Sequence, residues 1–419
     1  MRERKEAQTE EPGTTGRIPL DEIVRQGAQQ MLQAAIESEV AAFVEEHASL
    51  TTENGRRRIV RNGYLPPRQL LTGAGPLELR QPRARDRDAK GEEGIRFSPS
   101  ILPRYLRRSK NVDELIPWLY LKGISTGDFS EALQALVGPD AKGLSANVVV
   151  KLKSAWSKEL EAWEKRDLSG KEYVYVWADG VYFNVRLDDD RVCVLVLMGA
   201  TKDGKKELIA IGDGYRENEQ SWRELVLDLK RRGLTASPKI AIGDGALGFW
   251  AAIRKVWPDA KEQRCWVHKT ANVLNKLPKK AHFSAKKAIH EIWQAATEAD
   301  AEEAFDAFLE TYGPKWQKAA DCLKKDREVL LSFYGFPAQH WTHLRTTNPV
   351  ESTFATVRLR HRRTKGSGSR QATLTMVFKL MESAQKRWRR LNSPTLLLEV
   401  YRGKQFVNGE LATEEKDAA

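Results

Sequence analysis

The fold is decided by the run YVYVWADGVYFNV at residues 173–185 and by the shorter run KIAIGDG at residues 239–245. β-branched and aromatic residues dominate both runs, which is typical of buried strands. Working outward, we predict strands at 173–177, 182–187, 192–198 and 207–211, a helix at 221–232 and a strand at 239–242. Several strands followed by a helix and a further strand indicate a mixed α/β sheet.

Two acids end these apolar runs. Asp179 and Asp244 each precede a glycine, so both are predicted at the C-terminal ends of core strands. If the two strands are neighbours, they lie about 4.8 Å apart and the carboxylates can share a metal ion. An Asp-Gly pair is also ordinary turn chemistry, and the chain repeats it at Asp213. Asp213 therefore stays an alternative, although the apolar runs favour the other two.

A third acid, Glu351, lies near the start of a helix predicted at 349–363. Helical spacing places Glu351, Arg358 and Arg362 on one face, beside an apolar stripe that seats the helix. The stripe consists of Val350, Phe354 and Val357. The charged face continues into a basic segment, which indicates phosphate contacts. The predicted DNA contacts are Arg358, Arg360, His361, Arg362, Arg363 and Lys365.

Three converging carboxylates can hold two metal ions for an in-line phosphoryl displacement. Magnesium keeps several waters and accepts only one or two carboxylates, so three acids suffice for a pair of ions. Asp179, Asp244 and Glu351 are therefore the candidate catalytic and metal-binding residues. The expected cofactors are two Mg²⁺ (or Mn²⁺) ions in each active site.

The N-terminal part of the chain has a different pattern. Residues 1–19 are polar and aperiodic, which predicts a disordered tail. Between Asp21 and Phe43 apolar residues recur at steps of three and four, which predicts an amphipathic helix. A small hairpin is expected across residues 73–76.

Two helices further along resemble a helix-turn-helix. They are predicted at 129–136 and from a cap at Ser145, with a Gly-Pro break between them. In that motif the second helix would present Lys151 and Lys153 to DNA. A helical hairpin that binds nothing is the alternative.

Composition limits the class of protein. A chain of 419 residues with 41% apolar content is long enough for two or three domains. Lys and Arg exceed Asp and Glu by 69 to 57, and the net charge of +12 indicates a polyanionic partner. The three cysteines have no regular spacing, which indicates a reducing compartment. Without a signal-peptide pattern or an apolar run of about 18 residues, we expect a soluble intracellular protein with no membrane partner.

Cys265 and His268 form a Cys-x-x-His pair after the second acid. Taken alone, the pair suggests zinc. A structural zinc site needs four ligands, however, and no second pair has suitable spacing. We therefore expect a structural or DNA-positioning role near Asp244.

Four motifs resemble, in order, those of the Mutator-like bacterial insertion-sequence transposases of the DDE class. They are Asp179-Gly180-Val181-Tyr182, Gly243-Asp244-Gly245, Cys265-Trp266-Val267-His268 and Asn348-Pro349-Val350-Glu351-Ser352. The resemblance implies an RNase H-like core interrupted by an all-helical insertion, with a helix-turn-helix region before it. It also implies that Asp179, Asp244 and Glu351 form the metal-binding triad.

This resemblance predicts an organisation in eight segments. They are a disordered tail (1–19), an N-terminal helix and hairpin (20–83), a linker (84–95), a helical DNA-binding region (96–168), the first part of the core (169–258), the helical insertion (259–346), the second part of the core (347–392) and a C-terminal tail (393–419). The implied partners are double-stranded DNA, as terminal inverted repeats and as target, and further copies of the chain in a homodimer or higher oligomer. The implied location is the bacterial cytoplasm, at the nucleoid.

The expected activity is cleavage at the ends of a mobile element and transfer of the freed 3′-hydroxyl to target DNA. No P-loop pattern for ATP is present. Two alternatives stay open: a catalytically silent, transposon-derived DNA-binding protein, and an RNase H-like nuclease that cleaves without joining. The presence of all three acids favours an enzyme over the silent protein.

Overall fold

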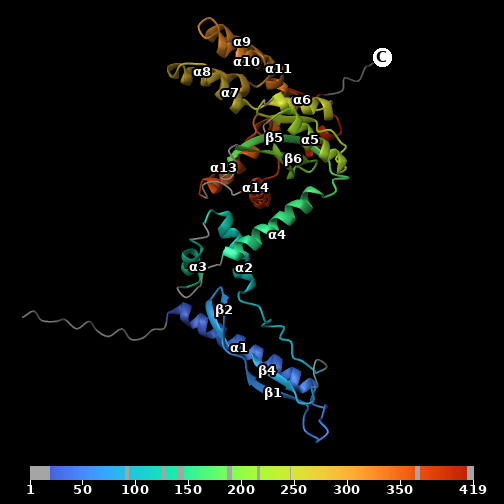
Figure 1. Ribbon diagram of the computed structural model, residues 1–419. Coiled ribbons are helices and arrows are strands. Elements are labelled where there is room, and N and C mark those ends of the chain that lie inside the picture. Colours follow the sequence, from blue (N-terminus) through green and yellow to red (C-terminus); the bar gives the residue numbers. More distant parts are fainter. Residues whose placement is uncertain are drawn as a thin grey trace, which may run out of the picture. The chain divides into compact units, whose positions relative to one another are not determined.

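The computed structural model describes residues 19–89, 94–124, 128–138, 146–185, 191–214, 218–245, 247–363 and 369–412 (Figure 1). The predicted disordered tail lies outside these ranges, except for its last residue. The chain forms two compact units, residues 1–148 and 149–419. Within the described ranges, no helix has both the length and the apolar character needed to cross a bilayer.

The first unit is built on α1 (Leu20–Glu46), one unbroken helix of 27 residues. Ile36 and Val40 lie one turn apart on its buried face, as the predicted amphipathic pattern requires. Beneath the helix, Ile36 packs in a cluster with Leu70, Leu77, Leu79 and Leu102. The helix prediction is therefore confirmed.

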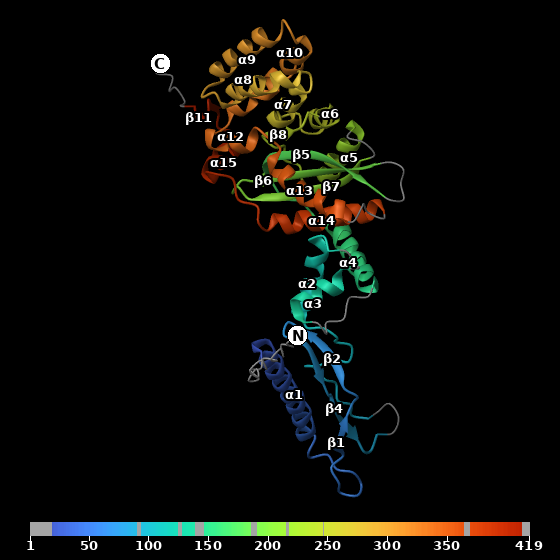
Figure 2. The same cartoon turned by 90° about the vertical axis from the view of Figure 1, so that its left-hand side faces the viewer.

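Two antiparallel strand pairs accompany α1 (Figure 2). β2 (Arg68–Thr72) pairs with β3 (Gly75–Leu79), which confirms the predicted hairpin. β1 (Ile59–Tyr64) pairs with β4 (Pro82–Asp86). The pairing of β4 corrects the linker predicted at 84–95, because its first three residues belong to this strand.

Buried Asp86 explains why a charged segment forms a strand. Its carboxylate accepts two hydrogen bonds of 2.8 Å from the Arg58 guanidinium and one of 3.0 Å from the backbone N–H of Ile95. The Arg58 guanidinium, as the largest cause, holds the pKa of Asp86 well below its usual range. The ion pair thus fixes the end of β4 against the residues just before β1.

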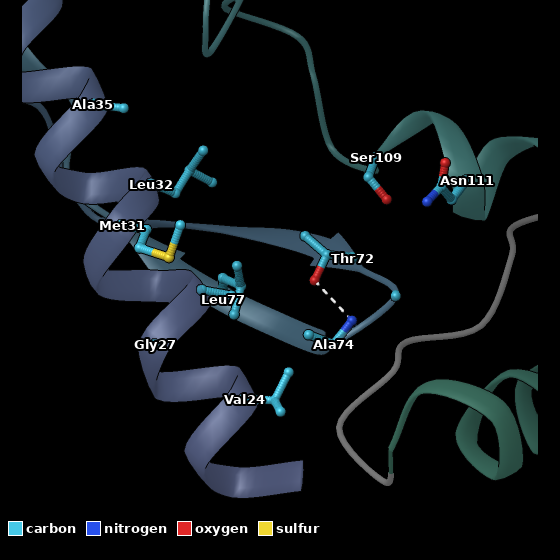
Figure 3. A pocket seen from close by; sticks show the side chains of 12 residues that line it. Val24, Gly27, Met31, Leu32, Ala35, Thr72, Ala74, Leu77, Ser109 and Asn111 are labelled. Atoms are coloured by element: carbon cyan, nitrogen blue, oxygen red, sulfur yellow. Dashed lines mark hydrogen bonds between the residues drawn. The ribbon is translucent and has the colours of Figure 1, made fainter.

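An apolar groove of about 850 Å³ lies between α1 and the β2–β3 hairpin. Figure 3 shows Val24, Met31 and Leu32 of α1 on one side, and Thr72 and Leu77 of the hairpin on the other. Among the described residues, none of the predicted catalytic or DNA-binding side chains lines it. The groove is therefore separate from the candidate site.

Three helices lead from the hairpins to the second unit. α2 (Lys110–Leu121) and α3 (Phe129–Val137) belong to the first unit, and α4 (Ala146–Glu164) begins at the division between the units. Phe129 and Leu133 are buried on α3, as a helix at 129–136 predicts. The segment between α3 and α4, with the predicted cap Ser145, lies outside the described residues.

A five-stranded sheet with the order β7-β6-β5-β8-β9 forms the centre of the second unit. β6 (Arg191–Thr201) lies between β5 (Tyr173–Asn184) and β7 (Lys206–Gly214) and pairs antiparallel with each of them. β8 (Ile240–Gly243) and β9 (Lys261–Arg264) continue the sheet parallel to β5. The predicted mixed α/β class is confirmed.

β5 is one continuous strand, and the prediction of two strands at 173–177 and 182–187 is wrong. Asp179 and Gly180 pair with Val196 and Leu195 of β6 and do not turn. Because β6 extends alongside the whole of β5, a turn here would leave backbone groups of both strands unpaired. Asp179 therefore lies inside β5 and not at its end.

Helices cover both faces of this sheet (Figure 2). α5 (Glu219–Arg231) and α6 (Leu247–Val256) pack on one face, where Trp222 and Phe249 share a cluster with Val176 of β5. The helices on the other face are α13 (Asn348–Arg363) and α14 (Arg370–Gln385).

Side chains alternate along β5, so Asp179 points to the face opposite Val176. On that face Phe183 packs against His361 of α13, with the rings tilted by 54° and their centroids 4.9 Å apart. Asp179 therefore faces the α13 side of the sheet.

Between β9 and α13 the chain forms helices and turns only, in a stretch that is described throughout. Its α-helices are α7 (Trp266–Leu274), α8 (His282–Gln294), α9 (Glu298–Tyr312), α10 (Gln317–Lys324), α11 (Arg327–Leu331) and α12 (Trp341–Leu344). After α14, residues expected to form a tail instead form α15 (Pro394–Tyr401), β10 (Phe406–Val407) and β11 (Glu410–Leu411). Leu397, Val400 and Phe406 are buried, so this segment packs on the rest of the unit.

Candidate active site

Strand register places the first two acids level with each other. β5 and β8 pair in parallel, with Tyr175 opposite Ile240, an offset of 240 − 175 = 65 residues. Asp179 and Asp244 have the same offset, 244 − 179 = 65, so the register extended past β8 sets them opposite each other. Neighbouring strands are about 4.8 Å apart. The two carboxylates therefore belong to one small region of the sheet.

The third parallel strand brings Cys265 to the same level. β8 and β9 pair as far as Gly243 with Arg264, and the N–H of Cys265 donates to the carbonyl of Gly243 at 2.8 Å. The N–H of Trp266 donates to the carbonyl of Arg345 at 2.9 Å. This second bond ties the far end of the helical segment to the same edge of the sheet.

Gly245 is required by the turn after Asp244. Its φ of +95° belongs to the region that favours glycine, and a Cβ atom there would collide with the guanidinium of Arg264. That guanidinium is held by an ion pair with Asp326. The turn that carries Asp244 is thus packed against a fixed side chain.

Glu351 reaches this region from the first turn of α13. Val350, Phe354 and Val357 are fully buried and seat the helix, as the predicted apolar stripe requires. The hydroxyl of Thr347 donates to Glu351 Oε1 at 2.9 Å. The carboxylate of Glu351 is therefore oriented from its own helix terminus.

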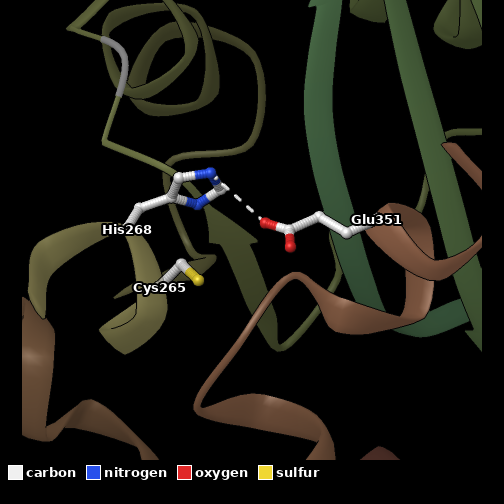
Figure 4. Close-up of side chains that lie close together, drawn as sticks. All are labelled: Cys265, His268 and Glu351. Carbon is white, nitrogen blue, oxygen red and sulfur yellow. Dashed lines mark ion pairs between the residues drawn. The ribbon is translucent and has the colours of Figure 1, made fainter. Parts of the chain in front are cut away.

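Figure 4 shows the side chains of Cys265 and His268 facing the side chain of Glu351. His268 Nε2 lies 3.2 Å from Glu351 Oε1, and Cys265 Sγ accepts a hydrogen bond of 3.3 Å from the N–H of Thr347. One ligand atom from each of Cys265, His268 and Glu351 lies within 4.8 Å of the others. The predicted Cys-x-x-His pair thus adjoins the third acid as well as following the second.

The surroundings of His268 favour its protonated form. The adjacent Cys265 side chain, as the largest cause, raises the pKa of His268 to about 9, and the charges of Glu351 and Asp179 act in the same direction. Burial opposes the shift. Both acids act on one imidazole and so share an electrostatic site, in which, among the described residues, the side chains within ligand distance of Glu351 are Cys265 and His268.

Asp213, the sequence alternative, lies elsewhere. It is in β7, which is separated from β5 by β6. Its carboxylate is 3.8 Å from Arg370 of α14. Asp213 therefore does not join the other acids.

The predicted DNA contacts differ in exposure. Arg358 and Arg362 are exposed on the face of α13 that carries Glu351, and Lys151 and Lys153 are exposed on α4. Arg360 is 2% exposed. His361 is also buried, against Phe183, and burial lowers its pKa. The side chain of Arg363 and all of Lys365 lie outside the described residues.

Thr347 is a site residue that the sequence argument missed. It contacts both Cys265 and Glu351 and so connects the Cys-x-x-His pair to α13. A hydroxyl four residues before an acid at a helix start is a recognisable spacing. This spacing of Thr347 and Glu351 is visible in the sequence, but many helix starts share it. Nothing in the sequence shows that Cys265 lies next to Thr347.

The site combines an acid inside one strand, an acid after the neighbouring strand and an acid on a helix that covers them. Comparison with known proteins identifies the class. The model of the family described as "Transposase, Mutator family" matches residues 3–391. The chain therefore belongs to the Mutator family of transposases.

Several curated relatives carry the same description. The chain is 52% identical over 306 residues to the transposase for insertion sequence element IS6120 of Mycolicibacterium smegmatis, which covers 73% of this chain and 94% of the relative. It is 47% identical over 286 residues to the transposase for insertion sequence element IST2 of Acidithiobacillus ferrooxidans, and this match covers 67% of this chain and 94% of the relative. The transposase for insertion sequence element IS256 in transposon Tn4001 of Staphylococcus aureus is 31% identical over 332 residues, and this match covers 78% of this chain and 81% of the relative.

Proposed function

We propose that this chain is a DDE-class DNA transposase that binds terminal inverted repeats, cleaves at the element ends and joins the freed 3′-hydroxyls to target DNA. The observation that carries the proposal is the shared register of Asp179 and Asp244, with Glu351 in the same electrostatic site. In the first step water cleaves a phosphodiester and leaves a 3′-hydroxyl on the element end. In the second, that hydroxyl attacks a target phosphodiester and displaces the target's own 3′-oxygen.

Asp179, Asp244 and Glu351 are the residues that would hold two Mg²⁺ (or Mn²⁺) ions. Hard carboxylate oxygens from three elements fit these cations, and the hydroxyl of Thr347 orients the carboxylate of Glu351. When bound, such ions activate the attacking oxygen and stabilise the leaving one.

Cys265 and His268 act on Glu351 in this proposal. The imidazole is 3.2 Å from the carboxylate, and the Cys265 sulfur is held by the backbone of Thr347. This contact supports a positioning role for the pair. A zinc site is less well supported, because Glu351 would have to serve as its third ligand and leave the catalytic triad.

DNA contacts and architecture complete the proposal. Exposed Arg358 and Arg362 extend from the face of Glu351, where they would grip phosphates next to the scissile bond. A mixed sheet with helices on both faces supports an RNase H-like core. We also propose a helix-turn-helix region from the sequence pattern, whose two predicted helices are present as α3 and α4. We further propose assembly as a homodimer or higher oligomer on paired ends, at the cytoplasmic nucleoid.

A strand-transfer assay tests the function. A labelled duplex that carries the inverted repeat flanking the coding sequence is incubated with the protein, a target plasmid and Mg²⁺, with EDTA as the matched control. We expect label joined covalently to the plasmid in Mg²⁺ only. Cleaved ends without joining would indicate a nuclease, and end binding without cleavage would indicate a silent DNA-binding protein.

A further inference from the structure

The β1–β4 ribbon has one face covered by α1 and one face turned to solvent. The covered face includes Ile59 of β1 and Asp86 of β4, which are opposite each other in the register and both buried. Figure 2 shows α1 running along the ribbon on one side. Because side chains alternate along a strand, the neighbours of these residues point away from α1.

That outer face is marked by arginines. Along β4 and the residue after it, burial alternates strictly: Pro82 and Asp86 are buried and Ala84 is half-buried, whereas the residues between and after them are exposed. These exposed residues are Arg83, Arg85 and Arg87. The partner of Arg85 on β1 is Val60, which adds no charge. Three guanidiniums in a row therefore extend from one face of a single strand.

The ribbon's acid does not neutralise this row. Asp86 is occupied by Arg58 through two bonds of 2.8 Å. Within the described part of the chain, Arg83 and Arg85 make no hydrogen bond and no ion pair. Arg87 makes one weak bond, of 3.4 Å, to the carbonyl of Arg57. Arg83 and Arg85 therefore have no bonding role within the described part of the fold.

The spacing of the row suits duplex DNA. Alternate residues of an antiparallel strand are about 6.8 Å apart, which equals about two base-pair steps along the duplex. The major groove is about 12 Å wide and admits a two-stranded ribbon. Arginine is the side chain that most often reads a base edge there, through guanine. Arg56 is exposed just before β1, whereas Arg57 beside it pairs with Glu45 of α1 at 3.5 Å.

We propose that the outer face of the β1–β4 ribbon is a duplex-DNA recognition surface, in which Arg83 and Arg85 enter the major groove of the element end. The inference rests on the proposed transposase function and deepens it by assigning part of end recognition to strands in addition to the α3–α4 pair. No element outside the ribbon is needed to build this surface.

The test measures binding of the full-length protein by fluorescence anisotropy across a range of salt. The probes are the inverted-repeat duplex and a scrambled duplex of the same length and composition. We expect Arg83→Gln/Arg85→Gln to weaken binding to the inverted repeat by at least about tenfold. Each guanidinium also brings positive charge to the duplex, so the slope of log affinity against log salt should become shallower, by less than the value of about 1.8 that two lost phosphate contacts would give. Both side chains are exposed, so the melting temperature should not change.

Two further variants sharpen the result. Arg83→Lys/Arg85→Lys keeps the charge but not the planar fork, so it should retain the salt slope and lose about fivefold or more of the preference for the inverted repeat. Lys279→Gln/Lys280→Gln removes the same charge from exposed positions in the second unit and should bind as wild type does.

The inference would be overturned if Arg83→Gln/Arg85→Gln kept the wild-type affinity and salt slope. It would also be overturned if Lys279→Gln/Lys280→Gln lost as much affinity for the inverted repeat as that variant does. Undiminished sequence preference in the Lys pair would overturn the placement in the groove. If the unaltered protein bound neither duplex, the proposed function would fail as well. If the wild-type protein binds the inverted repeat and the Arg83→Gln/Arg85→Gln variant binds it equally well, this inference fails and the proposed function is unaffected.

Discussion

The charge on His268 should make the stability of the second unit depend on pH. The pKa of His268 is about 9 in the folded protein, raised by Cys265 first and then by Glu351 and Asp179. In the unfolded chain a histidine titrates near about 6.5. A pKa raised by folding means that the folded state binds the proton more tightly. Its stabilisation is therefore complete below about pH 6.5 and is lost as the pH rises through about 9.

The size of this effect follows from the shift and the exposure of the side chain. A rise from 6.5 to about 9 corresponds to roughly 3.4 kcal/mol. Because 34% of the His268 side chain is exposed, solvent screening reduces this to about 1–2 kcal/mol. At about 2–4 °C per kcal/mol for a unit of this size, the contribution to the melting temperature is about 2–8 °C.

Thermal unfolding of the wild-type protein and of His268→Gln, both in EDTA, measures this contribution to the melting temperature. The melting temperature of wild type minus that of the variant should be greatest near about pH 6 and should approach zero near about pH 10. EDTA keeps added cations from competing with the imidazole for Glu351. A difference that is equal at both ends of this range would refute the ion-pair argument.

Other residues of the site give predictions of the same kind. Phe354→Ala should lower the free energy of unfolding by about 3–5 kcal/mol in urea titrations, because the ring is fully buried; Leu359→Ala, on the exposed side of α13, should change it by less than about 0.5 kcal/mol. Arg358→Ala/Arg362→Ala should make the salt slope of DNA binding shallower by about 1.8 without unfolding the protein, and an unchanged slope would mean that neither side chain contacts phosphate. Gly245→Ala should lower the melting temperature and slow strand transfer, since it adds both a strained φ and a collision; wild-type values in both assays would contradict the turn argument.

The sequence was sufficient to predict the class of fold and the presence of core strands leading to Asp179 and Asp244. The apolar runs before Asp179 and Asp244 mark core strands because only buried strands tolerate such density of Val, Ile and aromatic side chains. The seating of α13 was also predictable, since Val350, Phe354 and Val357 repeat with the period of a helix. Each of these features depends on local pattern alone.

Features that depend on distant partners were not predictable in this way. The Asp-Gly pair at residues 179–180 has the local chemistry of a turn, yet β6 keeps it in the ladder. The charged segment at 84–86 became a strand because Arg58, 28 residues before Asp86, neutralises that acid. Arg360 was predicted on a DNA-binding surface from charge, whereas the helix turns its side chain into the buried side of α13. In the first two cases a tertiary partner outweighs the local preference, and in the third the position on the helix decides the burial.

We propose that Asp179, Asp244 and Glu351 form one metal-dependent catalytic site. The direct measurement is strand transfer in Mg²⁺ by Asp179→Ala, Asp244→Ala and Glu351→Ala, with binding to the inverted-repeat duplex measured on the same preparations. Each variant should lose cleavage and joining while its binding to the inverted repeat is largely retained, because it lacks a metal ligand and keeps its phosphate contacts. Asp213→Ala, the matched control in the same sheet, should remain active. Normal strand transfer by any one of the three variants would contradict the assignment of the triad.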